Sequence, residues 1–452
     1  MVHSMTEGRP VRLILSFSIM VLLGDLFQQF YNIMDAVIVG RSLGPEALAA
    51  VGATSSVQFL ILGFGMGFCM GFAIPISQRF GAQDHSGMRR FVWHGWILLG
   101  VLAVVFTAGC AAATRPILRL LSVESSIFGM TYSYLFIIFL GIPCTLLYNY
   151  VANILRALGD SRTPFLFLVL SAFLNIGLDL LFIRVFGWGC GGAAFATILS
   201  QGVSGILSFL YMHAHYAILK TQPQEKRWSF HTAKKLLGMG FPMGLQFSIT
   251  AIGMVVMQSS INGLGSNYSS AFTAAARLKT FLMTPINALG SGASTFVGQN
   301  FGANKPQRIR QGVFHTLLCA IAYALASGLV MIFLGRRLSM IFLTDGAGVS
   351  RILDHSAYYL RCMGYLWWVL AFLNVYRMST QGLGYSGLAV FGGVLEMIAR
   401  SFVCLFLAPR FGYDAIVWAD QSAWIMAALY IVPTFYRCMK KVETRLRPKP
   451  AA

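Results

Sequence analysis

The sequence is poor in charge, and in negative charge above all. Only 11% of its 452 residues are Asp, Glu, Lys or Arg, and Asp and Glu together number 15. Soluble proteins carry about 25% charged residues. Hydrophobic residues make up 57% of the chain, more than a soluble core of this size absorbs. The composition therefore excludes an ordinary soluble protein and indicates an integral membrane protein, with room for about twelve spans of ~20 residues.

The chain also lacks the patterns of a disulfide framework, a metal centre or an enzyme active site. Its eight cysteines form no CxxC pair and mostly fall within apolar segments. None of its eight histidines shows HxxxH or HxxxxD spacing with an acid inside an apolar segment. We therefore expect neither an enzyme nor a bound cofactor. The first apolar segment is too long for a signal peptide and lacks a small-residue cleavage site, so we expect it to remain as a span.

Apolar windows of spanning length recur along the chain and predict an all-α membrane protein with twelve transmembrane helices. They lie at residues 12–39, 51–79, 91–113, 130–155, 164–185, 191–216, 236–263, 269–298, 313–335, 354–381, 387–408 and 414–436. The predicted organisation has four parts: an N-terminal six-helix lobe (1–216), a cytoplasmic linker (217–235), a C-terminal six-helix lobe (236–436) and a basic cytoplasmic tail (437–452).

The distribution of basic residues predicts the orientation. Lys and Arg number 34, which gives a net charge of +19. If the N-terminus lies in the cytoplasm, most loop Lys and Arg fall on the cytoplasmic side, including Arg89, Arg90, Lys234 and Lys235. We therefore expect a multi-pass protein of the cell membrane with both termini in the cytoplasm. The basic charge is then a signal of topology and lipid headgroup contact, and no nucleic-acid partner is expected.

Two short motifs recur at nearly the same offset along the chain. Gln78-Arg79-Phe80-Gly81-Ala82 returns as Gln299-Asn300-Phe301-Gly302-Ala303, and Leu158-Gly159-Asp160-Ser161 returns as Leu383-Gly384-Tyr385-Ser386. Each pair occupies the same loop of its half. Since each half has an even number of spans, the halves insert with the same orientation and are related by a pseudo-twofold axis along the membrane normal.

Acidic residues inside spans are costly, about 2.5–3.5 kcal/mol each at mid-bilayer, and need a reason. In the first span Asp25, Gln28, Asn32 and Asp35 are spaced three, four and three residues apart, which places them on one helix face. This face must lie against protein or water. It is either a structural network between helices or part of an ion or proton site.

Depth links Asp35 to two other spans. Asp35, Asp179 of the fifth span and Thr197 of the sixth all lie four to six residues from the outer end of their helices, roughly 6–9 Å deep. Asn175 precedes Asp179 by one turn on the same face. Two carboxylates, an amide and a hydroxyl at one depth predict a cation site for Na⁺ or a proton, and the residues leave both ions open.

The C-terminal half carries no equivalent set. Gln258 stands where alignment of the halves places Asp35. Glu396 and Arg400 are four residues apart and are expected to neutralise each other. Lys279, like Arg277, has no acidic neighbour in sequence, and its role stays open. Asp420 lies near the outer end of the last span, where an interfacial position is expected.

Several segments together resemble the multidrug and toxic compound extrusion (MATE) transporters, in the branch that includes the DinF-type and archaeal members. These segments are Phe30-Tyr31-Asn32-Ile33-Met34-Asp35, Leu43-Gly44-Pro45-Glu46-Ala47, Leu174-Asn175-Ile176-Gly177-Leu178-Asp179 and Gly192-Ala193-Ala194-Phe195-Ala196-Thr197. The resemblance covers the whole chain. It implies a V-shaped pair of six-helix bundles and a secondary active antiporter that exports lipophilic, often cationic, drugs or metabolites in exchange for protons or Na⁺.

The resemblance also implies that Asp35, Asn175, Asp179 and Thr197 bind the coupling cation. Two features depart from the family pattern. Related members have a proline about fifteen residues before the first-span Asp, where this chain reads Phe17-Ser18-Ile19-Met20. The C-lobe acids of the NorM-type branch also have no clear counterpart.

The expected partners are a small lipophilic substrate and the lipid bilayer, and a monomer is expected. From helix position we predict a set of substrate-cavity residues: Gln28, Tyr31, Tyr148, Asn149, Asn153, Gln246 and Met254. The alternative function is a lipid-linked oligosaccharide flippase of the same superfamily. Such flippases tend to have a cationic central cavity, which Arg277, Lys279, Arg361 and Arg377 leave open.

Overall fold

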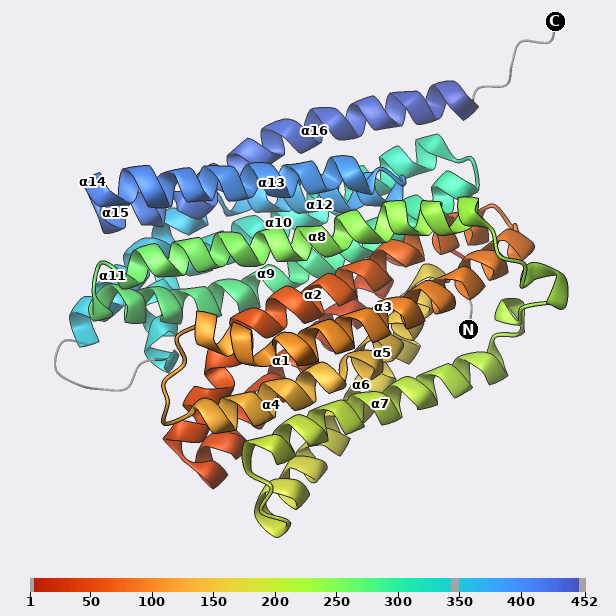
Figure 1. Cartoon of the computed structure of the whole chain (residues 1–452). Helices are drawn as coiled ribbons and strands as arrows, with labels where there is room; N and C mark the ends of the chain where they lie inside the picture. Colours follow the sequence, from red (N-terminus) through yellow and green to blue (C-terminus); the bar gives the residue numbers. More distant parts are fainter. Residues whose placement is uncertain (1–3, 343–348, 447–452) are drawn as a thin grey trace, which may run out of the picture. The chain divides into compact units, whose positions relative to one another are not determined.

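The computed structural model describes residues 4–342 and 349–446, and all regular structure among them is helical. The chain divides into two compact units (Figure 1). The N-terminal unit contains Ile19–Gly244, and the C-terminal unit contains Met5–Ser18 and the residues from Leu245 onward. Two long helices, α1 (Pro10–Leu43) and α8 (Phe230–Asn262), therefore each begin in one unit and end in the other.

The other helices of the N-terminal unit follow one another with short connections. They are α2 (Pro45–Gly81), α3 (His85–Leu120), α4 (Phe128–Leu140), α5 (Ile142–Ala157), α6 (Arg162–Asp179), the π-helical turn η1 (Leu180–Val185), α7 (Gly189–His215) and the 3₁₀ turns η2 (Ala217–Leu219) and η3 (Pro223–Glu225).

The C-terminal unit repeats this order. Its helices are α9 (Ser266–Gly302), α10 (Pro306–Ser339), the 3₁₀ turn η4 (Met340–Phe342), α11 (Val349–Tyr365), α12 (Trp367–Gly382), α13 (Ser386–Phe402), the π-helical turn η5 (Val403–Leu407), α14 (Ala408–Phe411), α15 (Tyr413–Val417) and α16 (Ala419–Leu446). The predicted basic tail is thus helical as far as Leu446, and residues 447–452 lie outside the described part.

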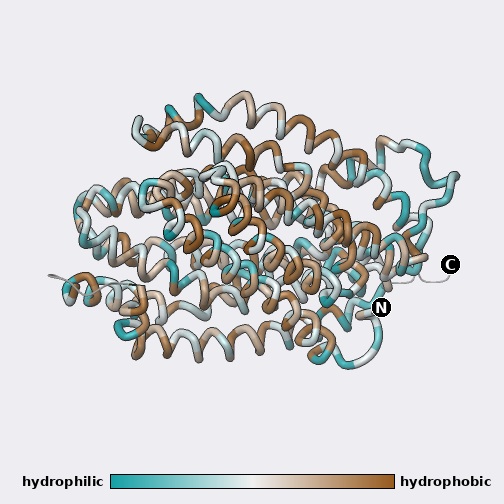
Figure 2. Tube along the Cα trace, turned by 90° about the horizontal axis from the view of Figure 1, so that it is seen from below, coloured by the Kyte–Doolittle hydropathy of each residue, from teal (hydrophilic) through white to brown (hydrophobic). Residues whose placement is uncertain are grey.

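Every predicted span coincides with a helix or with a pair of broken helices. Among the described residues, nine helices are long and apolar enough to cross a membrane, and α4 with α5 makes a tenth span bent by 45° at Gly141. Pro143 explains the break, because proline lacks the N–H that would continue the helix. The windows 269–298 and 354–381 are also helical, but more polar. Figure 2 shows hydrophobic residues along the helices and hydrophilic residues mainly at their ends. The predicted all-helical membrane fold is confirmed.

The backbone itself carries the repeat. Gly44 before α2 and Gly265 before α9 form one equivalent pair, with φ of 90° and 111°. Gly187 before α7 and Gly412 before α15 form a second pair, with φ of 67° and 58°. A residue with a β-carbon is strained in this region, so glycine is required at each turn. The two pairs are separated by nearly the same length of chain, and they define the offset between equivalent residues of the two units.

Glycines also let the two shared helices pack closely within each unit. A β-carbon on Gly71 of α2 would lie 2.5 Å from Cα of Gly240, in the first half of α8. The equivalent Gly292 of α9 lies against Ile14 and Ser18, in the first half of α1. Small residues permit such close approach of helix backbones in membranes. The start of each shared helix is thereby held against the second helix of the unit to which it belongs.

Candidate functional site

The N-terminal unit brings together the four residues predicted to bind a cation. Asp35 lies on α1, Asn175 and Asp179 on α6, and Thr197 on α7. Asn175 and Asp179 are fully buried. The carboxyl groups of Asp35 and Asp179 lie within hydrogen-bonding range of each other. Asp179 is the last α-helical residue before the π-helical turn η1, and such irregular turns are frequent at functional sites.

The amide of Asn175 orients this carboxyl pair. Its nitrogen donates to Oδ2 of Asp179 at 2.8 Å, and its oxygen accepts from the backbone N–H of Thr197 at 3.3 Å. The hydroxyl of Thr197 donates to the carbonyl of Ala193 at 3.1 Å and accepts from the hydroxyl of Tyr31 at 3.3 Å. The hydroxyl and amide oxygens are therefore held in place by neighbouring helices.

Each of the two carboxyl groups can accept a further hydrogen bond or contact a cation. Oδ1 of Asp35 and Oδ1 of Asp179 are both buried and have no hydrogen-bond partner in the described structure. Two ionised carboxylates within hydrogen-bonding range repel each other strongly where water is excluded. A proton or a monovalent cation between them removes that repulsion. The donors at this site are carboxylate, amide and hydroxyl oxygens, which are hard donors suited to Na⁺ or H⁺.

Two further residues complete this environment and were missing from the prediction. Tyr134 of α4 is 5% exposed and interacts electrostatically with Asp35 and Tyr31. Gln58 of α2 is hydrogen-bonded to Tyr134 and donates to the hydroxyl of Thr54 at 2.7 Å. The depth argument could have found Tyr134, because this residue lies near the outer end of the fourth predicted span.

Most of the predicted cavity residues of the N-terminal unit bond to groups near them in the chain. Gln28 donates to Asn32 at 3.5 Å, and Tyr148 donates to the carbonyl of Pro164 at 3.0 Å. Tyr31 donates to Thr197 of the predicted cation site. The amides of the remaining two donate to carbonyls one turn earlier: Asn149 to Thr145, and Asn153 to Asn149, both at 2.8 Å.

The other two predicted cavity residues belong to the C-terminal unit. Gln246 is buried and accepts from Gln381 at 2.7 Å, and Met254 is 41% exposed. A cavity of about 560 Å³ occurs elsewhere, beside α4 and α7. None of the seven residues lines it; the lining residues are Gly129, Met130, Ser133, Ile137, Trp188, Gly189, Cys190, Gly191 and Phe195. The substrate-contact set stays a prediction.

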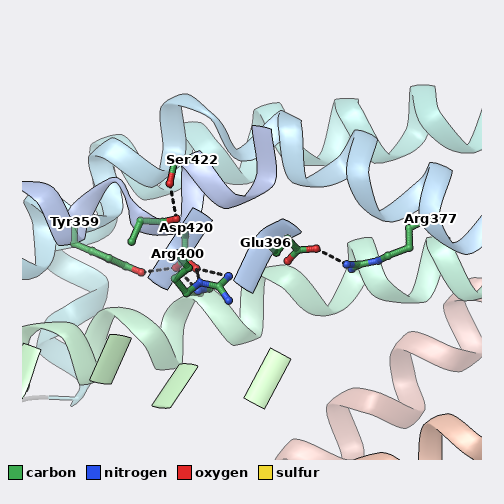
Figure 3. Close-up of polar contacts among 8 residues, drawn as sticks. Tyr359, Arg377, Glu396, Arg400, Asp420 and Ser422 are labelled. Carbon is green, nitrogen blue, oxygen red and sulfur yellow. Dashed lines mark hydrogen bonds and ion pairs between the residues drawn. The ribbon is translucent and has the colours of Figure 1, made fainter. Parts of the chain in front are cut away.

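The C-terminal unit contains a buried network of charges around Asp420 of α16 (Figure 3). Asp420 is 1% exposed. It accepts from Nζ of Lys279 at 2.5 Å, from Nη2 of Arg400 at 2.9 Å and from the hydroxyl of Tyr359 at 2.7 Å. Glu396 instead bonds to Nη1 of Arg377 at 2.6 Å.

One prediction for this unit, the pairing of Glu396 with Arg400, is therefore wrong. Arg400 takes Asp420 as its partner, while Glu396 takes Arg377. Spacing of four residues brings two side chains within reach, but other helices offered closer partners. Asp420 is buried within the unit, where two cations and a tyrosine make the burial of its charge possible, and its interfacial position stays a prediction.

A family model described as MatE matches residues 21–181 and 242–406. The chain belongs to the MatE family. Among similar proteins, the probable multidrug resistance protein YpnP of Bacillus subtilis (strain 168) is 32% identical over 307 residues, which is 68% of each chain. A protein named FAD transporter from Shewanella oneidensis is 25% identical over 369 residues, 79% of each chain.

Solved structures of MatE-family transporters share the fold. An outward-facing structure of a multidrug resistance MATE family transporter of the MOP superfamily superposes with a TM-score of 0.90, at 23% identity, over 98% of both chains. A crystal structure of MATE in the straight conformation superposes with a TM-score of 0.87, at 22% identity, over 97% of this chain and 98% of that one. Family membership and the apolar helices together make the protein a multi-pass membrane protein, and the predicted MATE fold is confirmed.

Proposed function

We propose that this MatE-family protein is a secondary active antiporter that exports lipophilic, often cationic, drugs or metabolites in exchange for H⁺ or Na⁺. The observation that carries the proposal is the pair of Asp35 and Asp179, each with a buried Oδ1 that has no hydrogen-bond partner, with Asn175 and Thr197 bonded around it. Relatives named multidrug resistance protein support export of small molecules. The protein acts as a monomer in the cell membrane, with both termini in the cytoplasm.

The chemistry of the pair couples the ion to a conformational change. With the cation bound, the repulsion between Asp35 and Asp179 is neutralised and α1 and α6 are held together. Without it, the pair favours a state in which the two carboxylates separate or are hydrated. A ligand shifts an equilibrium only by its differential affinity for the two states, and this pair supplies that difference. The cation enters from outside and leaves to the cytoplasm, and substrate moves the other way.

The substrate is proposed to contact residues predicted from helix position. These are Gln28, Tyr31, Tyr148, Asn149, Asn153, Gln246 and Met254. The flippase alternative depends on a cationic central cavity. It is less favoured, because Lys279 and Arg377 are each paired with an acid. Arg277 and Arg361 do not belong to those ion pairs.

Efflux of ethidium from proteoliposomes tests the proposal. Wild type, Asp35→Asn and Asp179→Asn are compared under a pH gradient alone and a Na⁺ gradient alone, with the exposed acid change Glu124→Gln as control. We expect both site variants to lose gradient-driven transport and the control to keep it. The gradient that drives wild type identifies the ion. Wild-type rates in both site variants under both gradients would sink the coupling proposal.

A further inference from the structure

The Asp420 network lies at the repeat-equivalent place of the cation site. The paired glycine turns, Gly44 with Gly265 and Gly187 with Gly412, bound the offset between equivalent residues. Between these turns, three members of the network are the counterparts of residues at the N-terminal site: Lys279 of Gln58, Tyr359 of Tyr134 and Arg400 of Asn175. Beyond the second pair, Asp420 corresponds to Thr197 when Trp418-Ala419-Asp420 is aligned with Phe195-Ala196-Thr197, two residues away from the offset of that pair. The counterparts also occupy equivalent helices, α2 and α9, α4 and α11, α6 and α13, α7 and α16.

One contact between these positions recurs in both units. In the N-terminal unit Asn175 on α6 bonds to Thr197 on α7, and Gln58 on α2 bonds to Tyr134 on α4. In the C-terminal unit Arg400 on α13 bonds to Asp420 on α16, and the side chains from α9 and α11 converge on the same carboxylate. The contact between the α6 and α7 positions is thus repeated between α13 and α16, whereas the side chains from α9 and α11 here bond to the carboxylate of Asp420.

The charges differ in a specific way. In the N-terminal unit the described contacts of Asp35 and Asp179 are with neutral groups and with each other, so the cation must come from solution. In the C-terminal unit the positions of these acids hold Gln258 and Cys404, and the acid has moved to Asp420.

Two positive side chains stand beside Asp420 where the N-terminal site has neutral ones. Lys279 takes the place of a glutamine and Arg400 that of an asparagine, and both contact the carboxylate of Asp420.

We propose that the C-terminal unit contains a latent site for a monovalent cation, in which the ammonium of Lys279 and the guanidinium of Arg400 take the place of the transported ion. This inference rests on the proposed cation site at Asp35. A cation attached to the chain is always present at its site and cannot be exchanged with solution. The C-terminal unit is therefore held in the cation-bound arrangement, and ion coupling belongs to the N-terminal unit alone.

The surroundings of Asp420 make this arrangement self-sufficient. Its carboxylate accepts once from Lys279, twice from Arg400 and once from Tyr359, and all four contacts are 3.1 Å or shorter. Glu396 acts electrostatically on Arg400, and Cys404 lies within the electrostatic influence of Arg400 and Asp420. Lys279 also lies over the ring of Trp424, 5.9 Å from its centroid. These donors leave an external cation no role while both tethered cations are in place.

Replacement of Lys279 and Arg400 by the neutral residues found at the equivalent positions of the N-terminal site tests the proposal. In purified full-length protein, Lys279→Gln with Arg400→Asn leaves Asp420 without a cation. We expect Tm to fall and then to rise by several degrees with added Na⁺ or with acid at constant ionic strength. This new response should persist with Asp35→Asn and disappear with Asp420→Asn. A lowered Tm that neither Na⁺ nor acid raises again would overturn the proposal.

A milder variant covers the case in which the double variant does not fold. Lys279→Ala keeps the Arg400–Asp420 pair and removes Lys279 beyond Cβ, which opens a space that a small alkylammonium ion can enter. We expect methylammonium to raise its Tm more than that of wild type, and not to do so once Asp420→Asn is added. Equal effects on all three proteins would contradict a cation site.

Wild type separates this inference from the proposed function. If an added cation raises the Tm of wild type and Asp420→Asn abolishes this rise, the proposed tethered cation is wrong. If the rise persists in Asp35→Asn, the proposed coupling site is wrong.

Discussion

The side-chain amide of Asn175 donates a hydrogen bond to Oδ2 of Asp179, one turn further along α6, at 2.8 Å. Its oxygen simultaneously accepts from the backbone of Thr197 on α7. One amide thus fixes both the direction of a buried carboxylate and the position of the neighbouring helix. Groups that orient a ligand residue typically contribute about 10–100-fold to ion affinity.

We therefore expect Asn175→Leu to lower the affinity for the coupling ion by about tenfold or more without abolishing folding. The measurement is the concentration of Na⁺ or H⁺ that gives half-maximal efflux in proteoliposomes. Ser171→Ala, one turn earlier on the same helix and also buried, is the control. An unchanged half-maximal concentration in Asn175→Leu would show that the amide is structural only.

The Arg377–Glu396 pair is expected to behave as a unit. The two side chains are 12% and 10% exposed and are joined at 2.6 Å. Removing one member leaves the other charge buried, which costs about 3–5 kcal/mol in a fully buried pair and less here. We expect Glu396→Gln and Arg377→Met each to lower Tm, and the double variant to recover most of the loss. Additive losses in the double variant would show that the pair is not coupled.

The linker is joined to α3 by Arg89 and Glu225. Nε of Arg89 donates to both carboxylate oxygens, at 3.0 and 2.8 Å, and Nη2 donates to Oε1 at 2.7 Å. These bonds lower the pKa of Glu225 from 4.5 to about 2. Because the pKa of Glu225 is lowered in the folded state, the ionised carboxylate stabilises that state at pH values above 4.5. This stabilisation is lost as the pH falls toward 2.

We expect Glu225→Gln to lower Tm at pH 7, by an amount corresponding to about 1–3 kcal/mol. The difference from wild type should shrink between pH 4.5 and about 2, where Glu225 of wild type becomes protonated. Thermal unfolding across that range measures it. Lys226→Gln, an exposed neighbour, should show no pH-dependent difference. A constant gap for Glu225→Gln at every pH would contradict an ionic origin.

Gly71 is expected to tolerate no β-carbon. An added β-carbon would lie 2.5 Å from Cα of Gly240 and 2.6 Å from the carbonyl of Met239, and backbone cannot move aside cheaply. We expect Gly71→Ala to destabilise the protein by about 1–3 kcal/mol. Gly100→Ala, within α3 with no atom inside 4 Å, should be neutral or stabilising by up to ~1 kcal/mol. Equal Tm for the two variants would contradict the close packing of α2 on α8.

Residues that act through helix position could be predicted without a structure. Asp35, Asn175, Asp179 and Thr197 meet because helical rise converts a count of residues into depth, and because a polar residue in an apolar segment must face protein or water. The repeat was readable from Gln78 and Gln299 for the same reason, since equivalent turns require the same residue types.

Partners across helices could not be predicted in this way. Lys279 and Asp420 lie 141 residues apart, and nothing local marks them as a pair. The four-residue spacing of Glu396 and Arg400 suggested a pair, yet the side chains turn to α12 and α16 instead. Gln58 carries no charge to draw attention to it, although it is hydrogen-bonded to Tyr134, which lies beside the acids.

The sequence by itself determined that the chain spans a membrane, that it has two related halves, and which helix faces are polar. Composition, periodicity and spacing are properties of a linear chain, and the bilayer turns them into depth and direction. Only the tertiary structure decided which charge meets which, because pairing depends on helix rotation and packing at the scale of one side chain. That packing separates a unit whose acids, Asp35 and Asp179, form the proposed cation site from a unit whose acid, Asp420, contacts Lys279 and Arg400.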